Sequence, residues 1–226
     1  MEMTKKELAL KLIERLKKAY PEASCTLDYN QAWKLLVGVR LAAQCTDERV
    51  NIVTEKLYKK FPDVDALAAA SPEEIEEIVR PCGLGRSKAR DISACMRILK
   101  EQYGGQVPET FDDLLKLPGV GRKSANLIMG DVFGKPAIVT DTHCIRLVNR
   151  MGLVEGIKDP KKVEMALWKL IPPKEGSDFL PPSGIPRKSS LQCEDKAGLR
   201  TLLRIRPVRQ EWGLKEKREN FLSACI

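Results

Sequence analysis

Apolar residues recur at helical spacing along almost all of the first 179 residues, and this periodicity restricts the fold more than any other feature. It begins with Leu8, Leu12 and Leu16, which follow a Thr4-x-x-Glu7 pattern typical of a capping box. Side chains about three or four residues apart share one helix face, so each segment can bury an apolar stripe against its neighbours. The pattern predicts an all-α fold.

Helix boundaries are marked by capping residues, prolines and glycines. We expect further helices to begin at Asp47, at Ser71-Pro72 with Glu74, at Thr110 with Asp113, and at Asp159-Pro160. We expect helices to stop at Gly104-Gly105, at 134–136 (Gly-Lys-Pro) and at Pro172-Pro173. The sequence therefore predicts short helices joined by tight turns.

The composition indicates a soluble, intracellular globular protein. The chain has 226 residues, 43% of them hydrophobic, which is enough for one large domain or two small ones. We find no apolar run near the roughly 20 residues that span a membrane, and the N-terminus lacks a signal-peptide core. Seven scattered cysteines without a C-x2-C spacing argue against a disulfide framework or a metal knuckle.

The net charge of +8 is weak support for nucleic-acid binding, because residues 180–226 carry ten basic and five acidic residues and so supply +5 of it. The segment 117–123 (LPGVGRK) is more informative. Its two glycines allow a sharp turn, and the free N–H groups of the helix that follows can bind phosphate. The alternative is a purely structural turn. The candidate DNA-binding residues are Gly119, Val120, Gly121 and Arg122.

Lys123 and Asp141 are the candidate catalytic residues. Lys123 falls in the first turn of the predicted helix, where the helix dipole favours the neutral, nucleophilic amine. Asp141 precedes another predicted helix, beside His143, and could stabilise positive charge at a sugar carbon. Alternatively, Lys123 contacts phosphate and Asp141 is an N-cap. We assign no catalytic role to His143.

Three segments together resemble the endonuclease III family of helix-hairpin-helix DNA glycosylases: LPGVGRKSAN, AIVTDTHCIRLVNRMGL and, upstream, LLVGVRLAAQCTDERVN. The resemblance covers residues 4–179. It implies a six-helix bundle over 28–132 and a second helical lobe made of 1–27 and 133–179, with DNA bound in the cleft between them. It also implies removal of oxidised pyrimidines from double-stranded DNA as part of base excision repair.

The resemblance implies that Lys123 attacks C1′ of a flipped-out nucleoside, forms a Schiff base and permits β-elimination at the abasic site, while Asp141 is the essential carboxylate. Gln44 matches the residue that fills the space of the flipped base, and Leu84 matches an apolar wedge. The alternatives are a packing amide and a core leucine. The presence of Lys123 argues against the adenine-mismatch branch, which lacks this lysine.

The sequence departs from the family after residue 179. The family has four cysteines there that bind a four-iron four-sulfur cluster, whereas this chain has only Cys193 and Cys225, so we expect no such cofactor and no metal. A one-base shift permits cysteine codons at Leu191, Leu199, Leu202 and Val208. We interpret 180–226 as an aberrant, disordered tail caused by a frameshift near Phe179; the alternative is a genuinely divergent tail.

We therefore expect a monomeric DNA glycosylase with abasic-site lyase activity, in the cytoplasm of a prokaryote in association with the nucleoid, and with no membrane partner. Two other interpretations stay open. One is a non-catalytic helix-hairpin-helix DNA-binding protein, for which a lysine beside Asp141 has no purpose. The other is a glycosylase fragment inactivated by its altered C-terminus.

Overall fold

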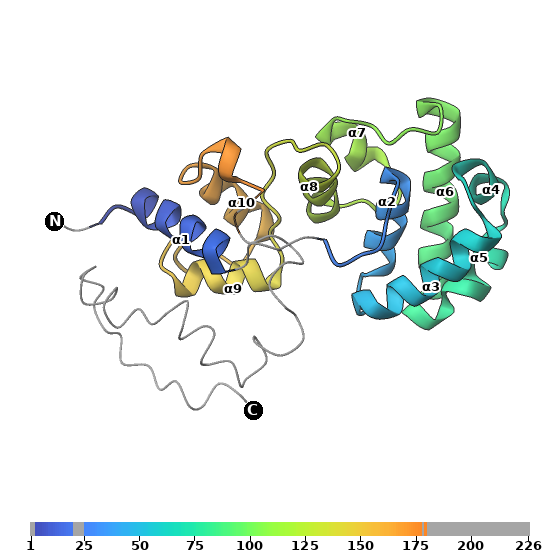
Figure 1. Cartoon of the computed structure of the whole chain (residues 1–226), viewed down its shortest axis with the longest axis horizontal. Helices are drawn as coiled ribbons and strands as arrows, with labels where there is room; N and C mark the ends of the chain where they lie inside the picture. The colour runs from blue at the N-terminus through green and yellow to red at the C-terminus, as the bar shows by residue number, and fades with distance from the viewer. Residues whose placement is uncertain (1–2, 20–24, 178, 180–226) are drawn as a thin grey trace.

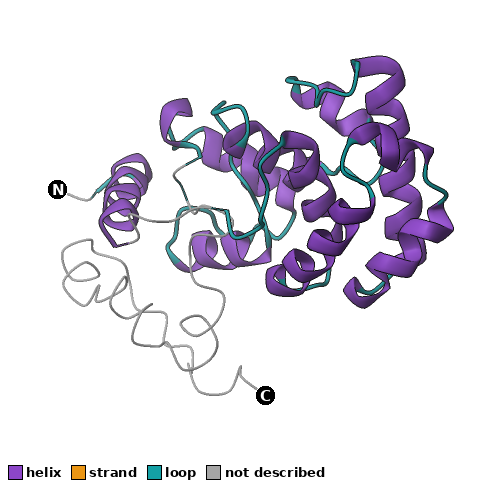
Figure 2. Ribbon diagram, turned by 45° about the vertical axis from the view of Figure 1, so that its right-hand side comes forward, coloured by secondary structure: helices purple, strands orange, loops and turns teal. Residues whose placement is uncertain are grey.

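The computed structural model describes residues 3–19, 25–177 and 179, and within them the chain consists of helices and loops without a strand (Figure 2). The all-α prediction is confirmed. The helices are α1 Lys5–Ala19, α2 Ala32–Leu41, α3 Asp47–Lys60, α4 Val64–Ala69, α5 Pro72–Val79, η1 Arg80–Cys82, α6 Gly85–Tyr103, α7 Phe111–Lys116, α8 Arg122–Asp131, α9 Thr142–Arg150, α10 Pro160–Trp168 and η2 Pro173–Glu175, where η marks a 3-10 helix.

The predicted helix starts are confirmed, and their caps explain why the helices begin there. Ser71 and Glu74 form a complete capping box at the start of α5, so each satisfies an N–H group that the helix leaves without a partner. Thr4 and Glu7 do the same for α1. At α3 the helix begins at Asp47 as predicted, but the capping side chain is Thr46.

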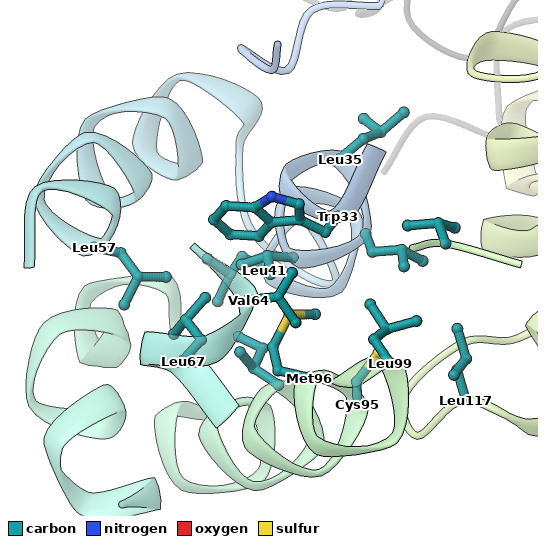
Figure 3. Close-up of a cluster of buried hydrophobic side chains, with 14 of the residues drawn as sticks. Trp33, Leu35, Leu41, Leu57, Val64, Leu67, Cys95, Met96, Leu99 and Leu117 are labelled. Atoms are coloured by element: carbon teal, nitrogen blue, oxygen red, sulfur yellow. The ribbon is translucent and has the colours of Figure 1, made fainter. Parts of the chain in front are cut away.

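The apolar faces of the helices are buried in two clusters. The larger cluster joins α2–α8, and Figure 3 shows Trp33, Leu41 and Met96 packed together in it. The smaller cluster joins α1 with α9, α10 and Phe179. Figure 1 shows the same arrangement, with α1, α9 and α10 at one end of the molecule and α2–α7 at the other. The N-terminal helix therefore packs against the C-terminal part of the described chain.

Two consecutive residues after α8 belong to different clusters. Ile138 is part of the smaller cluster and Val139 is part of the larger one. The boundaries that the sequence suggested, 28–132 and 1–27 with 133–179, stay a prediction. Residues 28–132 are all described and contain seven α-helices rather than the six that the resemblance implied, two of them only six residues long.

No helix in the described ranges is long and apolar enough to cross a membrane. The predicted disordered tail and its frameshift concern residues 180–226, which lie outside the described residues.

Candidate active site

The predicted hairpin joins α7 to α8 through residues 117–121. Its sharp turn depends on Gly119, whose φ of +77° lies in the left-handed region that side chains disfavour. A Cβ at this position would lie 2.7 Å from Arg40 Cδ. Both the backbone conformation and the close approach of α2 therefore require glycine here.

The hairpin leaves two backbone donors for a ligand. The Val120 N–H donates to the Leu117 carbonyl at 3.1 Å, whereas the N–H groups of Gly119 and Gly121 donate to no other described residue. Gly121 is the N-cap of α8, and a Cβ built on it would meet nothing within 4 Å. The exposed amides at the positive end of the helix dipole are suited to a phosphate.

The other side of the hairpin packs on α2 and α6. The Val120 side chain, with Pro118, borders a small hollow lined by Leu36, Val37, Arg40, Asp91, Ile92, Cys95 and Met96. Arg40 of α2 pairs with Asp91 of α6, with Nη2–Oδ2 at 2.6 Å, directly beneath Gly119. The hairpin is thus held by its apolar side chains and by the close contact of Gly119 with the Arg40–Asp91 pair, while Gly121 borders open space.

Lys123 is the second residue of α8, and its side chain is 46% exposed. Its Nζ lies 3.8 Å from Asp141 Oδ2. This distance is longer than a hydrogen bond, and the Lys123 amine donates no hydrogen bond within the described ranges. The amine is therefore both accessible and close to a carboxylate.

Asp141 is the N-cap of α9, and its Oδ1 accepts a hydrogen bond from the Cys144 N–H at 2.7 Å. The other oxygen, Oδ2, faces Lys123. Burial, followed by the Asp141 charge, raises the pKa of the Cys144 thiol to about 12. The carboxylate thus caps a helix with one oxygen and presents the other to the lysine, so the two roles considered for it from the sequence are compatible.

Arg122, the first residue of α8, is directed toward α10. Its Nη2 and Nε donate to the two carboxylate oxygens of Glu164, at 2.8 and 3.1 Å, and its guanidinium lies 4.8 Å from the centre of the Phe111 ring. The Glu164 side chain is only 4% exposed. The hydrogen bonds to Glu164 raise the pKa of Arg122. Arg122 therefore ties the hairpin helix to the smaller core cluster.

Gln44 and Leu84 are exposed and share an unusual backbone conformation. Their φ angles are 58° and 52°, and among the described residues they are the non-glycine residues with positive φ. Leu84 is 59% exposed, so it is not a core leucine. Backbone strain of this kind typically persists where function requires it.

The structure thus brings Lys123, Asp141 and the hairpin together, while no hydrogen bond or ion pair of the described part links Gln44 or Leu84 to them. Sequence reasoning missed Arg40, Asp91 and Glu164. No local pattern identifies them, because their partners lie far away in the sequence.

The described cysteines do not form a metal site. Cys25, Cys45, Cys82, Cys95 and Cys144 are free thiols. No group of three or more potential ligands occurs in 3–19, 25–177 and 179. The residues that would decide the presence of an iron-sulfur cluster, Cys193 and Cys225 included, lie outside this part.

An all-α fold in which a glycine hairpin opens a helix, with an accessible lysine facing a carboxylate, defines the class of helix-hairpin-helix DNA glycosylases. The model of the HhH-GPD superfamily of base excision DNA repair proteins matches residues 37–173. Endonuclease III of Synechocystis sp. is 45% identical over 177 residues, which cover 78% of this chain and 80% of that protein. The chain belongs to the endonuclease III family within this superfamily.

Solved structures support the same assignment. One, described as a non-covalent endonuclease III–DNA complex, is 40% identical with a TM-score of 0.72, and the match covers 77% of this chain and 81% of the other. A second, described as a trapped endonuclease III–DNA covalent intermediate, is 40% identical with a TM-score of 0.73, covering 77% and 82%.

Proposed function

We propose that this chain is a base-excision-repair DNA glycosylase that removes oxidised pyrimidines and cleaves the abasic product by β-elimination. The observation that carries the proposal is the 3.8 Å separation of Lys123 Nζ and Asp141 Oδ2 at the start of the helix that the hairpin opens. A DNA-binding module without chemistry has no use for an exposed amine beside a carboxylate at this position.

In the proposed reaction, the neutral Lys123 amine attacks C1′ of the damaged nucleoside. The electron pair of the glycosidic bond leaves with the base, which takes up a proton. The nitrogen loses one proton, and its lone pair then breaks the C1′–O4′ bond. O4′ takes up a proton as the sugar ring opens, which leaves a protonated Schiff base. Loss of a C2′ proton then expels the 3′ phosphate, and water releases the lysine.

The Asp141 carboxylate would stabilise the positive charge that develops at C1′ and on the lysine nitrogen. Its side chain is only 15% exposed, which strengthens this interaction relative to bulk water. The cap hydrogen bond from Cys144 fixes the orientation of the carboxylate, so no reorganisation is needed during the reaction.

DNA would bind through backbone and side-chain contacts around this pair. The free N–H groups of Gly119 and Gly121 support a phosphate contact that does not depend on base sequence. The Glu164 pair leaves Arg122 Nη1 without a partner among the described residues, so it can reach a phosphate. Gln44 and Leu84 would enter the duplex at the flipped nucleotide.

We also propose that the protein is a monomer, acts in the cytoplasm on nucleoid DNA, and carries no four-iron four-sulfur cluster. The sequence after residue 179 offers two cysteines, Cys193 and Cys225, for a cluster that needs four ligands. Iron analysis and the visible absorption spectrum of protein purified without oxygen test this point, and stoichiometric iron would contradict it.

Borohydride trapping tests the proposed activity. The full chain is incubated with duplex DNA that contains one abasic site, and Lys123→Ala serves as the matched control. We expect a covalent adduct with the wild-type chain and none with the variant, because borohydride reduces a Schiff base between Lys123 and the sugar to a stable amine that links the protein to the DNA. A parallel reaction with DNA containing an oxidised pyrimidine tests the glycosylase step.

Each result of this experiment is informative. An adduct that survives in Lys123→Ala would place the nucleophile elsewhere. No adduct with the wild-type chain, but an adduct with a version whose reading frame is restored after Phe179, would identify the chain as an inactivated glycosylase. No adduct with either would favour the DNA-binding module.

A further inference from the structure

Lys88, on α6, is the one residue among the largest fully buried side chains of the described chain that carries an ionisable group. Its exposed fraction is 0%. Taking an ammonium out of water is costly unless its N–H groups find partners. Lys88 Nζ donates to the carbonyl of Leu41 at 2.9 Å and to the carbonyl of Cys82 at 2.7 Å.

These two carbonyls stand at the ends of helices. Leu41 is the last residue of α2 and Cys82 is the last residue of η1. Carbonyls in the last turn of a helix lack an intrahelical partner and carry partial negative charge, so a cation is favourable beside them. Lys88 therefore joins two helix ends that the sequence keeps far apart.

The chain that leaves each of these helix ends leads directly to a strained, exposed residue. Gln44 follows Leu41 by three positions, and Leu84 follows Cys82 by two. They are the two non-glycine residues of the described ranges with positive φ. Strain of this kind persists only where the surrounding structure enforces it.

We propose that Lys88 is a positioning residue that holds the 42–46 loop and the 83–84 turn at a fixed separation, so that Gln44 and Leu84 enter the DNA duplex together. This inference rests on the proposed function. Lys88 does not touch the substrate. It acts through the backbone at Leu41 and Cys82, the anchor points of the two segments.

A positioning residue and an ordinary core residue should affect different steps of the reaction. Opening a duplex and filling the space of the flipped nucleotide require Gln44 and Leu84 in register. Schiff-base formation on a single-stranded abasic site requires only Lys123 and Asp141. Loss of the Lys88 ammonium should therefore impair the first process and spare the second.

Lys88→Met tests this, because methionine fills similar volume without a donor. Excision of an oxidised pyrimidine from duplex DNA is compared with borohydride trapping on a single-stranded abasic oligonucleotide, both in single turnovers. We expect duplex excision to fall about tenfold or more, since small misplacements of positioned groups have effects of this size, while single-strand trapping stays within about twofold.

Arg97→Met is the matched control. Arg97 also lies on α6 and donates to a backbone carbonyl, that of Ala68, at 3.1 Å, but this carbonyl belongs to α4 and leads to neither segment. Arg97→Met should lower stability without changing the ratio of duplex excision to single-strand trapping. If Lys88→Met does not fold, as judged by circular dichroism, Lys88→Gln keeps an amide donor and is measured in the same way.

A double-mutant cycle separates positioning from general damage. In a Gln44→Ala/Leu84→Ala background, Lys88→Met should cause no further loss of duplex excision, because the side chains it positions are already gone. Independent, multiplicative losses would overturn the proposal, as would equal losses on duplex and single-stranded DNA. Absence of a wild-type adduct would instead overturn the proposed function.

Discussion

Arg122 at the start of α8 and Glu164 of α10 form a bidentate ion pair, with donor–acceptor distances of 2.8 and 3.1 Å. This pair links a helix of the larger core cluster to a helix of the smaller one. The next residue in the chain is Lys123. The pair therefore fixes the helix that carries the proposed nucleophile relative to the cluster that contains α9, whose N-cap is Asp141.

Arg122→Ala should lower both stability and activity. It leaves the buried Glu164 carboxylate without its donors, for which we expect a loss of about 2 kcal/mol in the free energy of unfolding, reduced by the partial exposure of Arg122. Urea unfolding measures the loss. Arg122→Lys keeps the charge but not the fork geometry and should recover only part of it. Wild-type stability for Arg122→Ala would contradict the importance of the pair.

Asp141→Asn should separate the two roles of this residue. Asparagine can still cap α9, so the melting temperature should change little, whereas loss of the charge should reduce single-turnover excision by about a hundredfold or more. Asp141→Ala removes the cap as well and should cost about 1 kcal/mol in addition. If Asp141→Asn retains full activity, the residue is only a cap.

The two glycines of the hairpin should respond differently to alanine. In Gly119→Ala the alanine must adopt a positive φ, and its Cβ would lie 2.7 Å from Arg40 Cδ. We therefore expect the free energy of unfolding to fall by about 1–3 kcal/mol. At Gly121 the backbone is extended and a Cβ would lie in open space. Gly121→Ala should therefore keep the free energy of unfolding within about 0.5 kcal/mol of the wild-type value. Its Cβ should nevertheless weaken DNA binding, measured by fluorescence anisotropy. Unchanged affinity would argue against a phosphate at this amide.

Leu84→Gly should stabilise the protein while impairing it as an enzyme. Glycine relieves the left-handed strain at φ 52°, which we expect to raise the unfolding free energy by about 1 kcal/mol, and the exposed side chain contributes little to the core. Duplex excision should fall because the wedge is lost. A destabilised, fully active Leu84→Gly would show that this leucine serves the fold.

Alkaline pH should destabilise the fold through its buried thiols. Burial raises the pKa of Cys95, and burial and Asp141 raise that of Cys144, from 9.0 to about 12 in the folded state. The unfolded thiols ionise first, so the stability they contribute is complete below pH 9 and is lost as the pH rises to about 12. In unfolding curves across this range, Cys144→Ala should show a smaller decline; an identical decline would exclude this cause.

Much of the fold and the central pair could be predicted from the sequence, because the signals involved are local. Capping pairs such as Ser71 and Glu74 lie within one turn, and the glycines before Lys123 specify the hairpin wherever the segment is placed. The resemblance then supplied the roles that we propose for Lys123, Asp141, Gln44 and Leu84, since these residues stand within recognisable segments.

Only the tertiary structure decided how these segments support one another. The buried ammonium of Lys88, the Arg40–Asp91 pair beneath Gly119 and the direction of Arg122 toward Glu164 each depend on atoms that lie many residues apart. A charged side chain looks the same in sequence whether it faces water, DNA or a helix end. Burial and distance, which the packing of all the helices determines together, distinguish these cases.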